Sequence, residues 1–88
     1  MPRIEKRITI KSKQGLHARP AAVFVQIANK YSSTVTVRKG SEEVNGKSIM
    51  GILMMGADRL AELVLIVDGD DAEQSFQELE AFLVKEEH

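Results

Sequence analysis

The chain has 88 residues, of which 43% are hydrophobic and 28% charged, and this suits one small soluble domain with a single core. It has no cysteine, so neither disulfides nor thiolate-bound metal can hold it together. Its formal net charge of −1 argues against broad nucleic-acid binding, which favours a strongly basic face.

The first predicted strand lies near the N-terminus, where Ile4, Ile8 and Ile10 share one side of a period-2 pattern. A polar turn at residues 11–15 ends it. From Ala18, apolar residues at spacings of three and four predict a helix with one apolar stripe. The stripe consists of Ala21, Phe24, Ala28 and Tyr31.

Pro20 locates the start of this helix. Proline is tolerated only near a helix beginning, where backbone N–H groups lack intrahelical partners. The sequence therefore places His17 at or beside the N-cap.

Two short strands are predicted next. Val35 and Val37 alternate with polar residues, which indicates a second strand, and a turn at residues 39–41 leads into a third at residues 42–45. The dense apolar run at residues 63–67 is typical of a central strand.

Two further helices are predicted from their ends. Ser48 can cap a short helix that runs to about Met55, with Gly56 as its stop. Asp70 and Glu73 form an Asp-x-x-Glu capping pair before a last helix. That helix presents one apolar face, made of Ala72, Phe76, Leu79 and Leu83.

The predicted order is therefore β-α-β-β-α-β-α. Its strands are too few and its connections too short for a doubly wound parallel sheet. We expect an α+β fold in which three helices cover one face of a four-stranded antiparallel sheet.

His17 and Arg19 are the candidate chemical groups. A neutral imidazole nitrogen is a nucleophile near neutral pH, and a helix start favours the anion that it would carry after accepting a phosphoryl group. The Arg19 guanidinium offers a planar fork of donors for phosphoryl oxygens. The competing interpretation of His17 is an ordinary surface histidine, and that of Arg19 is a solvated arginine. Because the helix dipole mildly disfavours a cation in the first turn, the position of Arg19 favours a functional reason.

Ser48 and the apolar residues after it form a second candidate region. Capping by Ser48 is compatible with its phosphorylation by a regulatory kinase, because a phosphate at a helix start causes little local unfolding. The run at residues 49–55 is too apolar for a short helix to bury completely. We expect Ile52 and Met55 in the core, and an exposed surface that binds partners. The residues expected on that surface are Ile49, Met50 and Leu53.

Other kinds of site are excluded. His17 and His88 show no metal-ligand spacing with the scattered carboxylates, so no metal and no cofactor are expected. Residues 46–48 end like a P-loop, but Ser41 stands where that motif requires glycine. The N-terminus lacks the apolar run of a signal peptide, and residues 49–55 are far fewer than the roughly 20 that cross a bilayer. We therefore expect one domain, residues 1–88, in the cytoplasm and without membrane insertion.

Two motifs resemble those of a known family, and the number of residues between them also matches that family. Residues 15–21 (GLHARPA) and 45–51 (NGKSIMG) resemble HPr, the histidine-containing phosphocarrier of the bacterial phosphoenolpyruvate-dependent sugar phosphotransferase system. The similarity extends over nearly the whole chain. It implies an open-faced β-sandwich with sheet order 1-4-2-3, in agreement with the pattern of elements.

The resemblance also implies a function. His17 would accept a phosphoryl group from phosphorylated enzyme I on Nδ1 and pass it to the A domain of a sugar permease, with Arg19 assisting electrostatically. The chain would be a carrier, not an enzyme, and a monomer. Ser48 matches the serine modified by HPr kinase/phosphorylase, which slows transfer and, in some lineages, creates a co-repressor for a catabolite-control transcription factor. The surface around Met50 would dock these partners.

Two alternatives stay open within this family. The chain could act mainly as a regulatory module through Ser48, or as a carrier of the nitrogen-related phosphotransferase system. The nitrogen-related branch usually departs from the motif at residues 47–51, and His17 excludes the histidine-lacking regulatory paralogue. Gln14 and residues 53–55 (LMM) differ from common family residues. The change at residues 53–55 affects partner preference, and neither change touches the phosphoryl chemistry.

Overall fold

The computed structural model describes residues 2–86, and these follow the predicted order of strands and helices. His88, considered above as a metal ligand, lies outside the described residues. The elements are β1 (Arg3–Thr9), α1 (Ala18–Asn29), β2 (Thr34–Lys39), β3 (Glu42–Asn45), α2 (Ile49–Met55), β4 (Glu62–Asp68) and α3 (Ala72–Val84).

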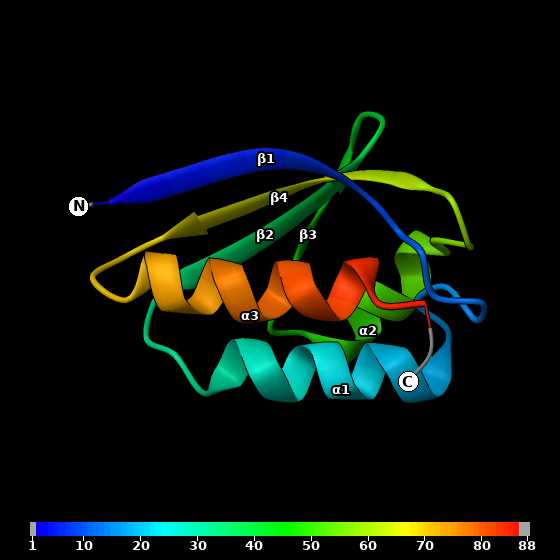
Figure 1. Cartoon of the computed structure of the whole chain (residues 1–88), viewed down its shortest axis with the longest axis horizontal. Coiled ribbons are helices and arrows are strands. Elements are labelled where there is room, and N and C mark those ends of the chain that lie inside the picture. Colours follow the sequence, from blue (N-terminus) through cyan, green and yellow to red (C-terminus); the bar gives the residue numbers. More distant parts are fainter. Residues whose placement is uncertain (1, 87–88) are drawn as a thin grey trace.

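The four strands form one antiparallel sheet in the order β1-β4-β2-β3, which confirms the expected fold. Strand β4 is central: Val67 pairs with Ile4 on one side and with Val35 on the other. All three helices lie against one face of the sheet, and the other face is open (Figure 1).

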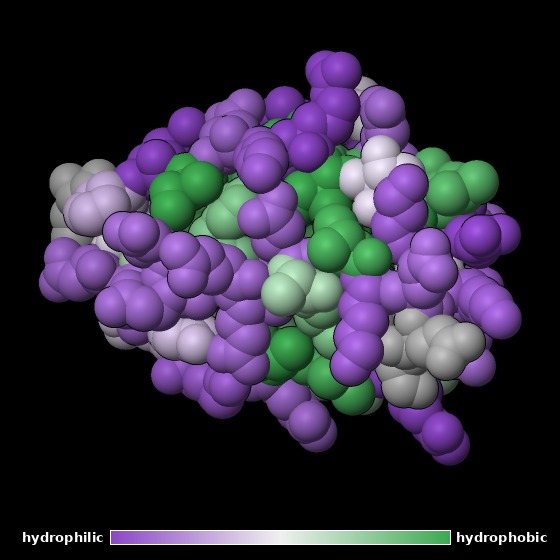
Figure 2. All heavy atoms as spheres, in the orientation of Figure 1, coloured by the Kyte–Doolittle hydropathy of each residue, from purple (hydrophilic) through white to green (hydrophobic). Residues whose placement is uncertain are grey.

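The core lies between the sheet and the helices. Alternate residues of the strands point inward and meet the apolar faces of the helices. Polar side chains cover most of the face shown in Figure 2, and apolar side chains show between the sheet and α3 and between α3 and α1. Fully buried large side chains include Ile10, Phe24, Val37, Ile52, Leu63, Leu65, Val67, Leu79 and Leu83.

The predicted cap of the last helix is wrong. Asp71, not Asp70, is the N-cap of α3, and its side chain makes no capping hydrogen bond. Its carboxylate instead accepts the backbone N–H groups of Ser32 (2.9 Å) and Ser33 (3.0 Å) and the Ser33 hydroxyl. Gly69 permits this contact, since a Cβ there would lie 2.4 Å from the Ser33 Oγ.

The first helix is shorter than its apolar stripe. α1 ends at Asn29, so Tyr31 lies beyond it and donates a 2.5 Å hydrogen bond to Glu78 of α3. The helix does not continue because the N–H groups of Ser32 and Ser33 bind Asp71 instead of carbonyls one turn earlier.

None of the helices within residues 2–86 combines the length and apolar character needed to span a bilayer.

Candidate functional site

His17 is the N-cap of α1, as Pro20 predicts. Its backbone is extended (φ −78°, ψ −170°), and its carbonyl accepts the N–H of Ala21 at 2.8 Å. The imidazole is 65% exposed and does not cap the helix. The ring is thus held outside the core, at the positive end of the helix dipole.

Gly15 brings the segment before His17 against a distant loop. It adopts φ +60°, and a Cβ at this position would lie 2.6 Å from the carbonyl oxygen of Ala57. Next to it, the N–H of Leu16 donates to that same oxygen at 2.8 Å. Both a left-handed backbone and a close approach therefore require glycine here.

Asp58, which the sequence did not single out, is the partner of the His17 ring. Its Oδ1 lies 2.9 Å from His17 Nε2, across 41 residues of sequence. An ionised carboxylate can only accept a hydrogen bond, so the ring proton belongs on Nε2. In the neutral imidazole, Nδ1 then carries the free lone pair.

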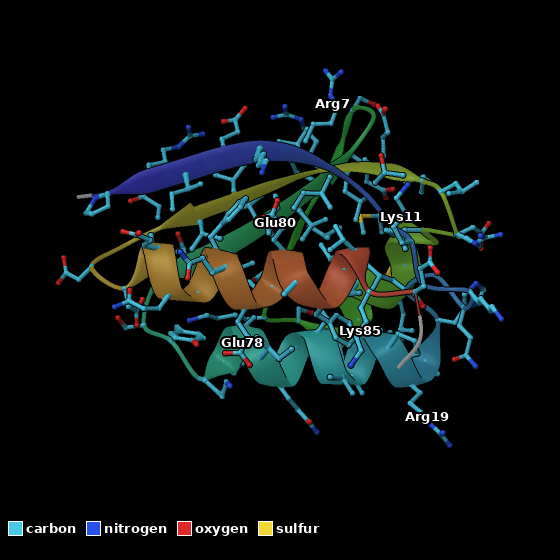
Figure 3. The ribbon with its side chains drawn as sticks, viewed as in Figure 1. Arg7, Lys11, Arg19, Glu78, Glu80 and Lys85 are labelled. Carbon is cyan, nitrogen blue, oxygen red and sulfur yellow. The ribbon has the colours of Figure 1, made fainter. Side chains whose placement is uncertain are left out.

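The cationic groups around the ring differ from the expected arrangement. A shallow hollow beside His17 is lined by Lys13, Gln14, Asp58 and Arg59. Arg19 instead borders the neighbouring groove between the start of α1 and the end of α3, and its side chain extends toward solvent (Figure 3). Within residues 2–86, its guanidinium has no hydrogen-bonding or ion-pair partner. Lys13 and Gln14 line both depressions.

Ser48 is the N-cap of α2, as predicted. Its Oγ accepts the N–H of Gly51 at 3.1 Å, and Gly56 ends the helix with φ +64°. The preceding residue is fixed by α1, because the Asn29 side chain donates to the carbonyl of Lys47 at 3.2 Å. Lys47 in turn donates from Nζ to the carbonyl of Tyr31 at 2.7 Å.

The exposed apolar residues of α2 follow the prediction and extend it. Ile52 and Met55 are buried, whereas four residues are exposed and form what we term the α2 surface. Met54 was missed, although its spacing of four from Met50 places it on the same helical face. The α2 surface consists of Ile49, Met50, Leu53 and Met54.

No group of three or more His, Cys, Asp or Glu residues is placed to hold a metal ion in the part of the chain that the structure describes. The side chains around His17 are instead a carboxylate, two cations and an amide. They surround an exposed imidazole at a helix start, on an α+β domain of the open-faced β-sandwich class.

Comparisons with known proteins agree with this class. A family model described as "PTS HPr component phosphorylation site" matches residues 4–85. The chain therefore belongs to the HPr family.

Individual relatives match over most of their length. The HPr-like protein Crh of Halalkalibacterium halodurans is 41% identical over 83 residues, which are 94% of this chain and 99% of that protein. The phosphocarrier HPr of Bacillus anthracis superposes with a TM-score of 0.91 at 36% identity, covering 94% of this chain and 99% of the other. An HPr dimer from Thermoanaerobacter tengcongensis is 50% identical, with a TM-score of 0.69 and coverage of 82% and 83%.

Proposed function

We propose that this chain is a phosphoryl carrier of the sugar phosphotransferase system. It accepts a phosphoryl group from phosphorylated enzyme I on Nδ1 of His17 and passes it to the A domains of sugar permeases. The observation that carries the proposal is the exposed ring of His17, whose Nε2 is occupied by Asp58 so that Nδ1 is left as the nucleophile.

The surroundings of the ring suit a transferable anion. The backbone N–H groups of Ala18 and Arg19 lack hydrogen-bond partners within residues 2–86, as expected for a first helical turn. Such groups and the helix dipole favour a phosphoryl dianion nearby. The long side chain of Arg19, which has no partner among residues 2–86, can turn toward this anion once it is present.

The direct test supplies enzyme I and phosphoenolpyruvate to the purified chain. We expect an acid-labile phosphorylated species that passes its label to a permease A domain, and no label on a His17→Ala variant. A His17→Ala protein that is still labelled would contradict the proposal.

Ser48 is proposed as the site of regulatory phosphorylation by an HPr kinase/phosphorylase. A phosphate on Oγ stays at the start of α2 but places about two negative charges beside the α2 surface. We infer that this surface docks enzyme I, the A domains and a catabolite-control transcription factor, so the added charge interferes with docking of the first two.

The prediction for Ser48 is that kinase and ATP yield a phosphoserine in wild-type protein and none in Ser48→Ala. Phosphorylated protein should accept the phosphoryl group from enzyme I at least tenfold more slowly, a change of about 1.4 kcal/mol in the transfer barrier. Equal rates before and after Ser48 phosphorylation would remove the regulatory role.

The main alternative is a regulatory module that acts through Ser48 without carrying phosphate on His17. The similarity to Crh of Bacillus subtilis, which is described as a catabolite repression HPr and is 37% identical with a TM-score of 0.71, favours this alternative. Labelling of Ser48 together with failure of the enzyme I reaction would support this alternative. A nitrogen-related carrier would instead accept phosphate from the enzyme I of that branch. We place the carrier in the cytoplasm as a monomer, with the surface around His17 free.

A further inference from the structure

The geometry points to Asp58 as a positioning residue for phosphoryl transfer: it holds the Nε2–H of His17, keeps the lone pair on Nδ1, and balances the charge that the ring gains. This inference rests on the proposed function. The contact is 2.9 Å long and joins two side chains that are 65% and 77% exposed. The strength of this contact therefore depends on how well the backbone fixes both partners.

Backbone hydrogen bonds fix Asp58 on both sides. Before it, the buried Ala57 accepts the N–H of Leu16 at 2.8 Å. After it, Leu60 donates to the carbonyl of Ile10 at 2.8 Å, and Ala61 accepts the N–H of Ile10 at 3.0 Å. The segment around Asp58 is therefore tied to the same stretch of chain, residues 10–16, that leads into His17.

The turn that carries Asp58 is kept at a conformational cost. The N–H of Ala61 donates to the carbonyl of Asp58 at 3.0 Å, which closes a four-residue turn. Its third residue, Leu60, has φ +70°, where glycine or asparagine is favoured. Strained residues persist where the surroundings determine them, and they cluster at functional sites.

The chemistry gives the carboxylate a role at each step. The lone pair of Nδ1 forms a bond to phosphorus while the bond from phosphorus to the donor breaks, and the donor keeps that electron pair. The proton on Nε2 stays in place, so the ring changes from neutral to cationic. The carboxylate of Asp58 then faces a cation through a charge-assisted hydrogen bond. When the phosphoryl group leaves for the next acceptor, the ring becomes neutral again.

The contact can be measured before any phosphoryl transfer. In protein with ¹⁵N-labelled histidine at alkaline pH, we expect a protonated Nε2 and an unprotonated Nδ1. In Asp58→Ala, the proton should divide between both nitrogens, so their ¹⁵N shifts move toward each other. Asp58→Asn keeps an acceptor oxygen without the charge and should stay closer to wild type. Asp70→Asn, which removes an exposed carboxylate at the opposite end of β4, is the matched control.

Transfer from phosphorylated enzyme I should be about 1.5- to fivefold slower in Asp58→Ala, the effect expected of an exposed ion pair. The enzyme I concentration at half-saturation should not change, and Asp70→Asn should behave as wild type. Unchanged ring shifts in Asp58→Ala, or altered shifts with an unchanged rate, would overturn the inference. Failure of wild-type protein to accept phosphate would refute the proposed function and the transfer role together, whereas the ring shifts report the contact in either case.

Discussion

The backbone near His17 uses left-handed conformations at three places with different surroundings. Gly15 is crowded by Ala57 and Asp58, so it needs both the conformation and the missing side chain. Gly56 has no atom within 4 Å of its hypothetical Cβ, so only its conformation matters. Leu60 adopts φ +70° with a full side chain that is 57% exposed. Substitutions at these positions therefore test the effect of backbone strain separately from the effect of steric contact.

Leu60→Gly is expected to stabilise the protein. Removing the left-handed strain gains about 1–2 kcal/mol, and the added freedom of glycine in the unfolded chain costs roughly 0.5–1 kcal/mol. The free energy of unfolding in urea should therefore rise by about 0.5 kcal/mol.

Gly56→Ala is the control for this prediction. It introduces the strain without a steric contact and removes the freedom of glycine in the unfolded chain, so it should lower the free energy of unfolding by about 0.5 kcal/mol. A Leu60→Gly protein that is less stable than wild type would mean that the Leu60 side chain stabilises the turn by more than the strain costs.

The start of α3 and the loop between α1 and β2 are joined by a polar network. Asp71 binds Ser32 and Ser33. About two turns further along α3, Glu78, which is labelled in Figure 3, accepts hydrogen bonds from Lys30 (2.6 Å) and Tyr31 (2.5 Å). Hydrogen bonds from the Ser33 hydroxyl and the Ser32 N–H lower the pKa of Asp71 to about 2. The hydrogen bond from Lys30 and, to a smaller extent, that from Tyr31 lower the pKa of Glu78 below its ordinary value.

This network predicts how stability depends on acid. The folded pKa of Asp71, about 2, lies below its ordinary value of 3.8, so its stabilising effect is complete above about pH 4. The effect is lost as the pH falls from about 4 to about 2. Urea unfolding across this range should therefore show the stability difference between wild type and Asp71→Asn shrinking.

Asp70→Asn, an exposed neighbour outside the network, should follow the wild-type profile at each pH. A constant difference between wild type and Asp71→Asn from pH 6 to pH 2 would show that ionisation of Asp71 does not contribute.

For the whole molecule, the sequence predicts what depends on local periodicity. The element order and the core residues follow from apolar spacing, and Pro20, Ser48 and Gly56 mark helix ends by rules that involve a few neighbours. The strand order 1-4-2-3 came from the family resemblance, since no local pattern specifies which strands are adjacent.

The parts that sequence could not provide are contacts between distant segments. Asp58 meets His17 across 41 residues and Asp71 meets Ser33 across 38. Nothing near either aspartate in the sequence indicates its partner. The predicted Asp70–Glu73 cap is wrong for the same reason. The local motif does not show that Asp71, the N-cap of α3, binds two serines that are distant in the sequence.

The central position of β4 has a consequence for synthesis. β1 and β2 do not pair with each other, and both pair with the strand that the ribosome makes last. A nascent chain that ends before residue 62 can form the β2–β3 hairpin, but β1 has no neighbour and the apolar stripe of α1 has no completed sheet to cover. Residues 57–61, which bring Asp58 to His17, immediately precede this strand. Completion of the sheet and assembly of the imidazole–carboxylate pair should therefore occur together, late in translation.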